Sequence, residues 1–312
     1  MDLELKNQTF PLSYTEFILR GFPGVSSFRE VLAIPFFIVY VLILSGNLII
    51  ISRIWVEKTL QSPMYHLIAL LFTVNITCTT AIVPSTLLAL LCGLDGTSLD
   101  GCLFQMFFMY VMVMFESDVL LLMALDRYVA ICRPLHYHDI MTSRLLLLLS
   151  ILGFIECSLL VSPIVIVASK VEFCSSNLIL DFVCENMVLL NLGCGNIDDI
   201  QMVGLMVRVL VTAMDISLLL ASYSRILYIT MNLVTGKSRH KTLHTCGTHL
   251  CVVILNYSCG LLSSIAYRMP ISIDLQNLTS AIYFLFPATI HPLIYGYRVT
   301  EIRACLIKSW RR

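Results

Sequence analysis

Residues 31–54 read VLAIPFFIVYVLILSGNLIIISRI, with no charged side chain before Arg53. A helix that crosses the hydrocarbon core of a bilayer needs about 20 largely apolar residues, so this stretch is long enough to span a membrane. Further runs of this kind lie at residues 62–88, 102–126, 144–168, 200–224, 243–267 and 278–297. The strict alternation that is typical of a membrane β-barrel is absent. The sequence therefore predicts an all-α membrane protein, a bundle of seven transmembrane helices.

The composition agrees with a membrane protein. Of the 312 residues, 58% are hydrophobic and only 13% are charged, whereas a soluble domain has about 25% charged residues. The formal net charge is +0, which gives no bulk electrostatic attraction to nucleic acid. The sequence contains neither a zinc-like spacing of Cys and His nor an H-E-x-x-H or G-x-S-x-G motif. We therefore expect no metal, no cofactor and no enzymatic activity.

The basic residues indicate how the chain is oriented. With the N-terminus outside, most of the 20 Lys and Arg residues fall in the inner segments, as the positive-inside rule requires. We expect an extracellular N-terminus at residues 1–30, the bundle at 31–297, and a cytoplasmic tail with a short amphipathic helix at 298–312, all in the plasma membrane. Asn7 begins an N-glycosylation acceptor on the outer face, and Asn277 begins a second one close to the membrane.

Four of the 12 cysteines fall on the predicted outer side, where disulfides persist. Cys102 begins the third predicted helix, and Cys174, Cys184 and Cys194 lie in the loop before the fifth. Four cysteines allow three pairings, and the spacing alone does not choose among them.

Short motifs stand within the predicted helices or at their ends. Residues 123–132 read MALDRYVAIC. The others are Gly-Asn at 46–47, Pro-Met-Tyr at 63–65, Ser-Tyr at 222–223, KTLHTC at 241–246 and PLIYG at 292–296. Together they resemble the motifs of the vertebrate odorant receptors, a branch of the rhodopsin-like G-protein-coupled receptors. Residues 22–24, 115–117 and 267–268 resemble the fish-like class I branch of that family.

The resemblance implies an odorant receptor that binds a small organic ligand in the outer half of the bundle. The partner inside the cell would be a stimulatory, olfactory-type heterotrimeric G protein. The resemblance also implies two disulfides that hold the long outer loop over the bundle, Cys102–Cys184 and Cys174–Cys194. A small-solute transporter is the competing class, but transporters built from inverted repeats have two similar halves. The sequence shows no such repeat.

The residues expected to couple to the G protein lie at the inner ends of the helices. Arg127 can form an ion pair with Asp126 when the receptor rests, and its release would give a partner protein something to bind. Tyr223 and Tyr295 could exchange partners between two packings, or they could be packing residues only. The full expected set is Asp126, Arg127, Tyr128, Tyr223, Lys241, Thr245 and Tyr295.

An ionisable side chain at membrane depth costs about 2.5–3.5 kcal/mol on insertion scales and calls for a function. Glu116 lies within about 20° of the helix face of Arg127, so we expect it to point into the bundle toward Asn75. There it either holds a cation or proton, or is a neutral core carboxyl. Asn75 and His291 depart from the family, which usually has Asp and Asn at these positions.

Two arginines are candidate ligand anchors. Arg208, in the outer half of the predicted fifth helix, either awaits an anionic ligand or pairs with Glu156 or Asp215. Arg268 lies one helical turn after Ser264. In the class I branch, an Arg at the matching position resembles an anchor for carboxylates, which a guanidinium can grip with two hydrogen bonds. The alternative is an interfacial arginine whose head group reaches water.

The resemblance places an apolar and aromatic wall around these arginines, formed by Tyr110, Val113, Met114, Tyr257 and Gly260. The predicted ligand is a small organic anion such as a carboxylate. The alternative is a neutral apolar odorant, in which case the arginines are structural.

Overall fold

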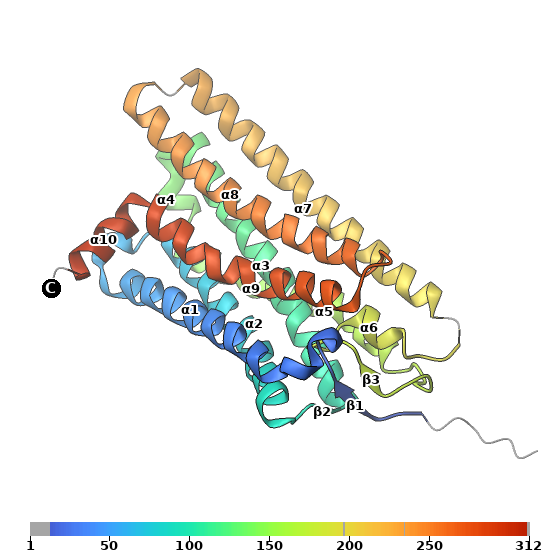
Figure 1. Ribbon diagram of the computed structural model, residues 1–312. Helices are drawn as coiled ribbons and strands as arrows, with labels where there is room; N and C mark the ends of the chain where they lie inside the picture. Colours follow the sequence, from blue (N-terminus) through green and yellow to red (C-terminus); the bar gives the residue numbers. More distant parts are fainter. Residues whose placement is uncertain (1–12, 196, 234, 311–312) are drawn as a thin grey trace, which may run out of the picture.

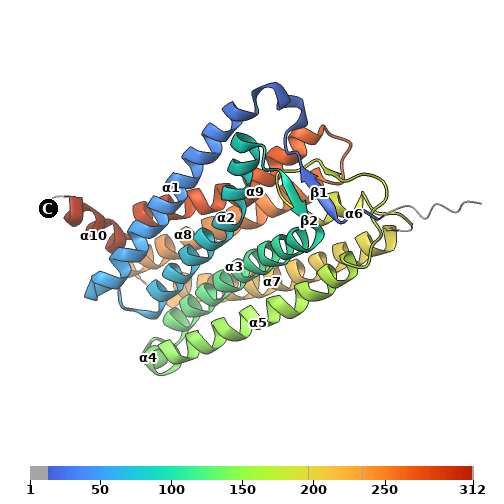
Figure 2. The same ribbon diagram turned by 90° about the horizontal axis from the view of Figure 1, so that it is seen from below.

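The computed structural model describes residues 13–195, 197–233 and 235–310. Within these ranges, seven helices are long and apolar enough to cross a membrane. They are α1 (Arg29–Val56), α2 (Pro63–Cys92), α3 (Leu99–Cys132), α5 (Ser143–Ala168), α7 (Asp198–Leu233), α8 (Gly236–Ala266) and α9 (Ile273–Arg298). Figures 1 and 2 show them running side by side as one bundle. The seven predicted transmembrane helices are confirmed.

Several helices extend well beyond the apolar runs that predicted them. α3 continues past residue 126 to Cys132, and α7 continues past residue 224 to Leu233. Apolarity marks only the part of a helix that lies in hydrocarbon, whereas the backbone hydrogen bonds continue into its polar ends. The predicted boundaries at 126 and 224 are therefore too short.

Local signals fix where helices begin and end. The hydroxyls of Ser98, Thr142 and Ser272 accept a hydrogen bond from the backbone N–H three residues later, and so cap α3, α5 and α9. Pro63 opens α2, where its missing N–H would have no helical partner anyway. Gly93 ends the same helix with a φ of 65°, in the left-handed region that favours glycine.

A small sheet at the disulfide end of the bundle was not predicted. Its central strand is β1 (Glu16–Leu19), which pairs antiparallel with β2 (Gly96–Ser98) and parallel with β3 (Leu178–Ile179). The N-terminal segment is thereby held between the α2–α3 connection and the outer loop, the described residues 169–195 that follow α5. Strands this short carry no periodic pattern that a sequence could reveal.

Shorter elements complete the two ends. They are η1 (Pro23–Phe28), η2 (Lys58–Leu60), η3 (Pro134–His136), α4 (Tyr137–Ile140), α6 (Asn186–Leu190) and α10 (Thr300–Trp310). In Figures 1 and 2, α6 lies at the end with the sheet, whereas α4 and α10 lie at the opposite end. α10 is the short helix expected in the tail, and Lys308 on it lies 3.7 Å from Glu57 at the end of α1.

Among the described helices, α2 and α3 carry the most fully buried apolar residues. Ile68, Phe72 and Ile82 on α2, with Val119 and Leu120 on α3, are fully buried. The outward faces of the other helices instead expose large apolar side chains, for example Phe37, Leu147, Leu159, Leu210, Leu220 and Leu261. Lipid tails are as apolar as leucine, so these outward faces of the helices are suited to contact with the bilayer.

Candidate functional site

The structure contains both expected disulfides, Cys102–Cys184 and Cys174–Cys194. The first joins the start of α3 to the outer loop, and the second closes that loop on itself. The backbone N–H of Cys184 also donates to Oε1 of Gln105, at 3.1 Å. The middle of the outer loop is therefore fixed over the end of the bundle.

Arg208 connects three helices beneath this loop. It projects from the outer half of α7, and its Nη1 donates to the Ser264 hydroxyl on α8 at 2.7 Å. Its guanidinium carbon lies 5.8 Å from the centre of the Tyr110 ring on α3. A cation over an aromatic face contributes about 0.5–2 kcal/mol, more where water is excluded. Three residues predicted for the ligand site thus lie together.

Glu185 is a site residue that sequence reasoning missed. The Tyr110 hydroxyl donates to Oε1 of Glu185 at 2.8 Å, so this tyrosine lies between the guanidinium of Arg208 and a carboxylate. Oε2 of Glu185 accepts from the backbone N–H of Met187 and Val188, and caps α6. Its place in the sequence, directly after Cys184, is the signal that could have found it.

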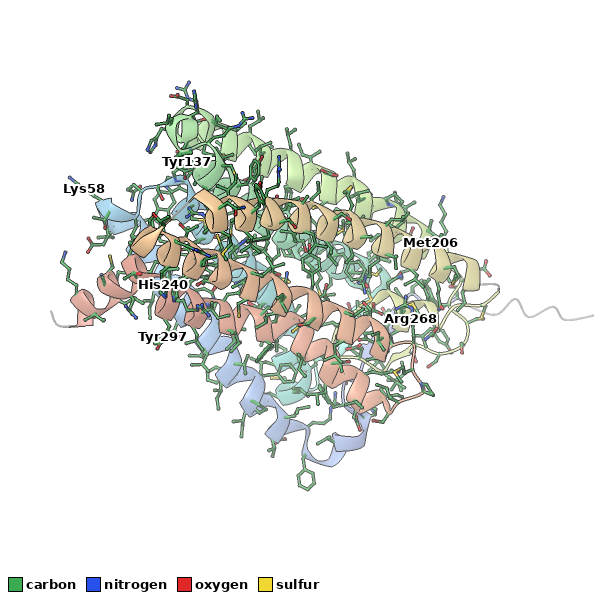
Figure 3. All side chains as sticks on the ribbon, turned by 90° about the horizontal axis from the view of Figure 1, so that it is seen from above. Lys58, Tyr137, Met206, His240, Arg268 and Tyr297 are labelled. Atoms are coloured by element: carbon green, nitrogen blue, oxygen red, sulfur yellow. A yellow bond between two sulfur atoms is a disulfide. The ribbon has the colours of Figure 1, made fainter. Side chains whose placement is uncertain are left out.

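Arg268 follows the end of α8 and is exposed. Its Nη1 donates to the carbonyl oxygen of Ser264 at 2.7 Å. Ser264 therefore accepts from both arginines, Arg208 at its hydroxyl and Arg268 at its carbonyl. In Figure 3, Arg268 lies at the same end of the molecule as Met206 and at the opposite end from Lys58.

The two carboxylates that were alternative partners for Arg208 lie elsewhere. Asp215 is buried on α7, about 10 Å further along the helix axis, and accepts from the Tyr257 hydroxyl at 3.2 Å. Glu156 is exposed on α5. Among the ion pairs of the described residues, neither carboxylate pairs with Arg208. The structure therefore contradicts both pairings that the sequence left open as alternatives to an anionic ligand.

Three more residues of the expected wall lie on α3 and α8. Val113 and Met114 are half-buried on α3. A Cβ added at Gly260 would lie 3.1 Å from Cε2 of Tyr283 on α9, so this glycine packs directly against a tyrosine ring. Tyr283 is thus a further neighbour of the site that sequence reasoning missed, because only the packing of α8 on α9 brings it there.

A second carboxylate of the outer loop lies close to the end of α8. Asp181 is fully buried, and it accepts from the Tyr267 hydroxyl and from the backbone N–H of Phe182 at 2.7 Å. Burial raises the pKa of Asp181 to about 7, an effect that the hydrogen bond from Tyr267 opposes and the nearby Glu185 carboxylate reinforces. Asp181 therefore carries a proton for part of the time at neutral pH.

At the expected cation site, His291 lies beside Glu116 and Asn75. Oε1 of Glu116 lies 3.6 Å from Nδ1 of His291, and Nδ2 of Asn75 lies 3.3 Å from the same nitrogen. Nδ2 of Asn75 also donates to Asn47. Among the described residues there is no group of three His, Cys, Asp or Glu side chains that could hold a metal ion. His291 is thus the group that links Glu116 to Asn75.

At the inner end of α3, Arg127 forms an ion pair with its neighbour Asp126. Its Nη2 lies 2.7 Å from Oδ2 of the buried Asp126, and the Tyr137 hydroxyl donates to Oδ1 of the same carboxylate at 2.8 Å. Sequence reasoning gave no sign of Tyr137, which Figure 3 shows at the same end of the molecule as Lys58.

The two tyrosines expected to rearrange have separate partners. Tyr223 pairs through its hydroxyl with Nδ1 of His249, while Tyr295 is buried with its ring 5.7 Å from that of Phe72. Tyr128 and Thr245 are half-buried nearby. The side chain of Lys241 lies outside the described part of the chain.

One glycosylation acceptor is excluded by its burial. Asn277 is 1% exposed, and its amide donates to the carbonyl oxygens of Leu180 and Ile273. The expectation of a second acceptor is therefore wrong, because a glycan needs an accessible amide. Asn7 lies outside the described residues.

These features define a class of protein. A seven-helix bundle, an outer loop tied to α3 by a disulfide, and an Asp-Arg pair at the inner end of α3 are the arrangement of a rhodopsin-like receptor. The crystal structure of squid rhodopsin matches with a TM-score of 0.71, over 91% of this chain and 86% of that chain. The two sequences are 13% identical, so this match shows the fold alone.

The sequence comparisons identify the family. The olfactory receptor family profile matches residues 36–311. Human olfactory receptor 52N2 is 33% identical over 94% of this chain and 92% of its own length, and human olfactory receptor 52B6 is 35% identical over 91% and 85%. The chain belongs to the olfactory receptor family. It is therefore a multi-pass membrane receptor for small odorants that couples to G proteins, and not an enzyme.

Proposed function

We propose that this receptor responds to a small organic anion, such as a carboxylate, with Arg208 as its anchor and Arg268 at the entrance. We also propose that it activates a stimulatory G protein of the olfactory type. The observation that carries the ligand proposal is that both arginines donate to one residue, Ser264.

The charges around Ser264 favour an anion. Glu185 faces the same tyrosine as Arg208, but Arg208 forms no direct ion pair among the described residues. Two guanidiniums in one region repel each other, and a bound carboxylate would relieve that repulsion. A charge-assisted hydrogen bond contributes about 1.5–3 kcal/mol, which corresponds to a roughly ten- to hundredfold change in affinity.

A neutral apolar odorant is the second candidate, and one observation favours it. Arg208 already has a hydrogen-bond acceptor in Ser264 and an aromatic face in Tyr110, so it is not a cation without partners. In that case the arginine would be structural, and the ligand would contact only the apolar wall.

A comparison of an acid with its methyl ester separates the two candidates. Cyclic AMP responses would be recorded for a panel of carboxylic acids and their esters in cells that express the receptor. We expect the acid to be the more potent member of a pair, and Arg268→Ala to weaken the acid more than the ester. Lys170→Ala is the matched control, because it removes an exposed charge at the outer end of α5. Equal potency of acid and ester in the parent receptor would favour the neutral odorant.

A further inference from the structure

A cavity of about 350 Å³ lies at the outer end of the bundle, between α2 and α3. Neither Arg208 nor any other residue expected to bind the odorant lines it. Its floor consists of two helical stripes with side chains about one turn apart: Ala81, Ser85 and Ala89 on α2, and Gln105 and Phe108 on α3. The small side chains on α2 leave the space that the cavity occupies.

The roof of the cavity is aromatic and belongs to two separate segments. Phe22 of the N-terminal segment stacks on Phe182 of the outer loop, with ring centres 6.0 Å apart and an angle of 21° between the rings. Both rings line the cavity. Ligand pockets of about 300–1,000 Å³ with mostly apolar walls and a few polar groups are typical of small-molecule sites.

Exposed apolar side chains border this cavity. Phe104 and Leu94 line it and are also 69% and 66% exposed, on a surface that includes the exposed Leu88 and Leu91. An exposed apolar surface on a membrane helix faces lipid. The opening therefore lies where a slender apolar chain would arrive from the membrane.

One end of the cavity carries an arginine that is paired with an aspartate. Oδ2 of Asp95 lies 3.6 Å from Nη1 of Arg29 and 3.9 Å from Nε of Arg20. Arg29 and Asp95 both line the cavity. Asp95 is thus shared between two guanidiniums, of which only Arg29 lines the cavity. Because Arg29 does not have this carboxylate to itself, it can also pair with the head group of an anionic ligand.

We infer that this cavity is a second ligand site, for a medium-chain amphiphile whose apolar tail lies between α2 and α3 and whose carboxylate meets Arg29. At roughly 30 Å³ for each water-sized group, the volume holds about a dozen non-hydrogen atoms, the size of decanoate. This site is independent of the proposed odorant anchor.

The occupant would contact a segment that also borders the candidate odorant site. Phe182 lines the cavity, whereas Asp181 and Glu185 in the same loop contact Tyr267 and Tyr110. Gln105 connects the floor to this loop, since it donates to the carbonyl of Ala81 and accepts from the backbone of Cys184. An amphiphile in the cavity is therefore expected to alter the response to an odorant.

Photolabelling would test the site directly. The full-length receptor in nanodiscs is irradiated with decanoic acid that carries a diazirine on its chain, and the labelled peptides are mapped. We expect labels within residues 81–108 that excess decanoate removes, and labelling that falls about tenfold in Ala89→Leu and Ala81→Leu because each fills the cavity. Ala221→Leu, on an exposed position of α7, is the matched control and should label as the parent does. Arg208→Ala should also leave the labelling unchanged.

Competition identifies the head group and the source of the ligand. Decanoate should displace the label better than decanol, and Arg29→Gln should remove that difference. The inference is overturned by labels confined to α7 and α8, by labelling spread evenly over lipid-facing residues, or by labelling that both filling variants leave unchanged. Displacement by a lysophospholipid but not by decanoate would equally overturn it, because the occupant would then be a bilayer lipid.

Discussion

Asp181 shows how a single buried carboxyl can make the outer loop sensitive to pH. Burial raises its pKa to about 7, from an ordinary value of 3.8. Between these values the folded protein holds a proton that the unfolded chain has lost, so the stability that Asp181 contributes is greatest at low pH. That contribution falls as the pH rises toward 7.

We therefore expect Asp181→Asn to flatten the pH dependence of stability. Asparagine stays neutral, and its single oxygen can accept from the backbone N–H of Phe182, as Oδ1 of Asp181 does. Its amide nitrogen replaces Oδ2 and can donate to the Tyr267 hydroxyl instead of accepting from it. Thermal unfolding of the purified receptor at about pH 5 and about pH 8 would measure this pH dependence of stability. The parent should lose apparent stability as the pH rises between these values, and the variant should lose less. The same loss in both proteins would show that Asp181 does not titrate in this range.

Individual site residues were predictable only where a helix carries them. The position of Arg208 along an apolar run, and the helical spacing of Ser264 from Arg268, are enough to predict that these residues share one region. Asp181 was not predictable, because the path of the outer loop depends on tertiary contacts. For Glu185 the only signal was its place directly after Cys184. Tyr283 was missed for a related reason, since the sequence does not say which face of α9 meets Gly260.

Among the elements, the outer loop depends on its two disulfides. Cys102–Cys184 fixes the segment that carries Asp181 and Glu185, whereas Cys174–Cys194 joins residues only 20 positions apart within the loop. Loss of a native disulfide typically costs about 2–5 kcal/mol. We expect Cys174→Ser and Cys184→Ser to lower surface expression, and Cys184→Ser also to abolish the ligand response of the receptor that reaches the surface.

Surface labelling of an epitope-tagged receptor, combined with cyclic AMP dose–response curves, would measure both effects. A full ligand response from Cys184→Ser at matched surface expression would contradict the role of the first disulfide. Detection of Cys184 as a free thiol by non-reducing peptide mapping would contradict the pairing itself.

The elements were predictable to different degrees. Apolar runs of 20 or more residues identify transmembrane helices because the bilayer imposes their length. The strands β1, β2 and β3 were not predictable, because each is only a few residues long and is defined by its partners rather than by its own pattern. The inner turns of α3 and α7 were not predicted, because they lie beyond the ends of the apolar runs.

For the whole molecule, the inner end holds Arg127 in the ion pair that we expect of a resting receptor. Arg127 is bound to Asp126, and Asp126 is bound in turn by Tyr137. Since coupling requires a group that the G protein can contact, we expect Arg127→Ala to abolish the cyclic AMP response. Ligand affinity should stay within a few-fold, because Arg127 and Arg208 lie toward opposite ends of the bundle. Both quantities would be measured at matched surface expression, and an unchanged cyclic AMP response would contradict the assigned role.

Direct measurement of ligand affinity is the simplest test of whether Arg208 binds the anionic group of the ligand. The measurement is the affinity of the purified receptor in nanodiscs for the most potent acid of the panel, in the parent, Arg208→Lys and Arg208→Ala. We expect a roughly ten- to hundredfold loss of affinity in Arg208→Ala, with poor rescue by lysine, which keeps the charge but loses the planar fork. The affinity for the methyl ester should change little. Equal affinity of all three proteins for the acid would contradict this role of Arg208.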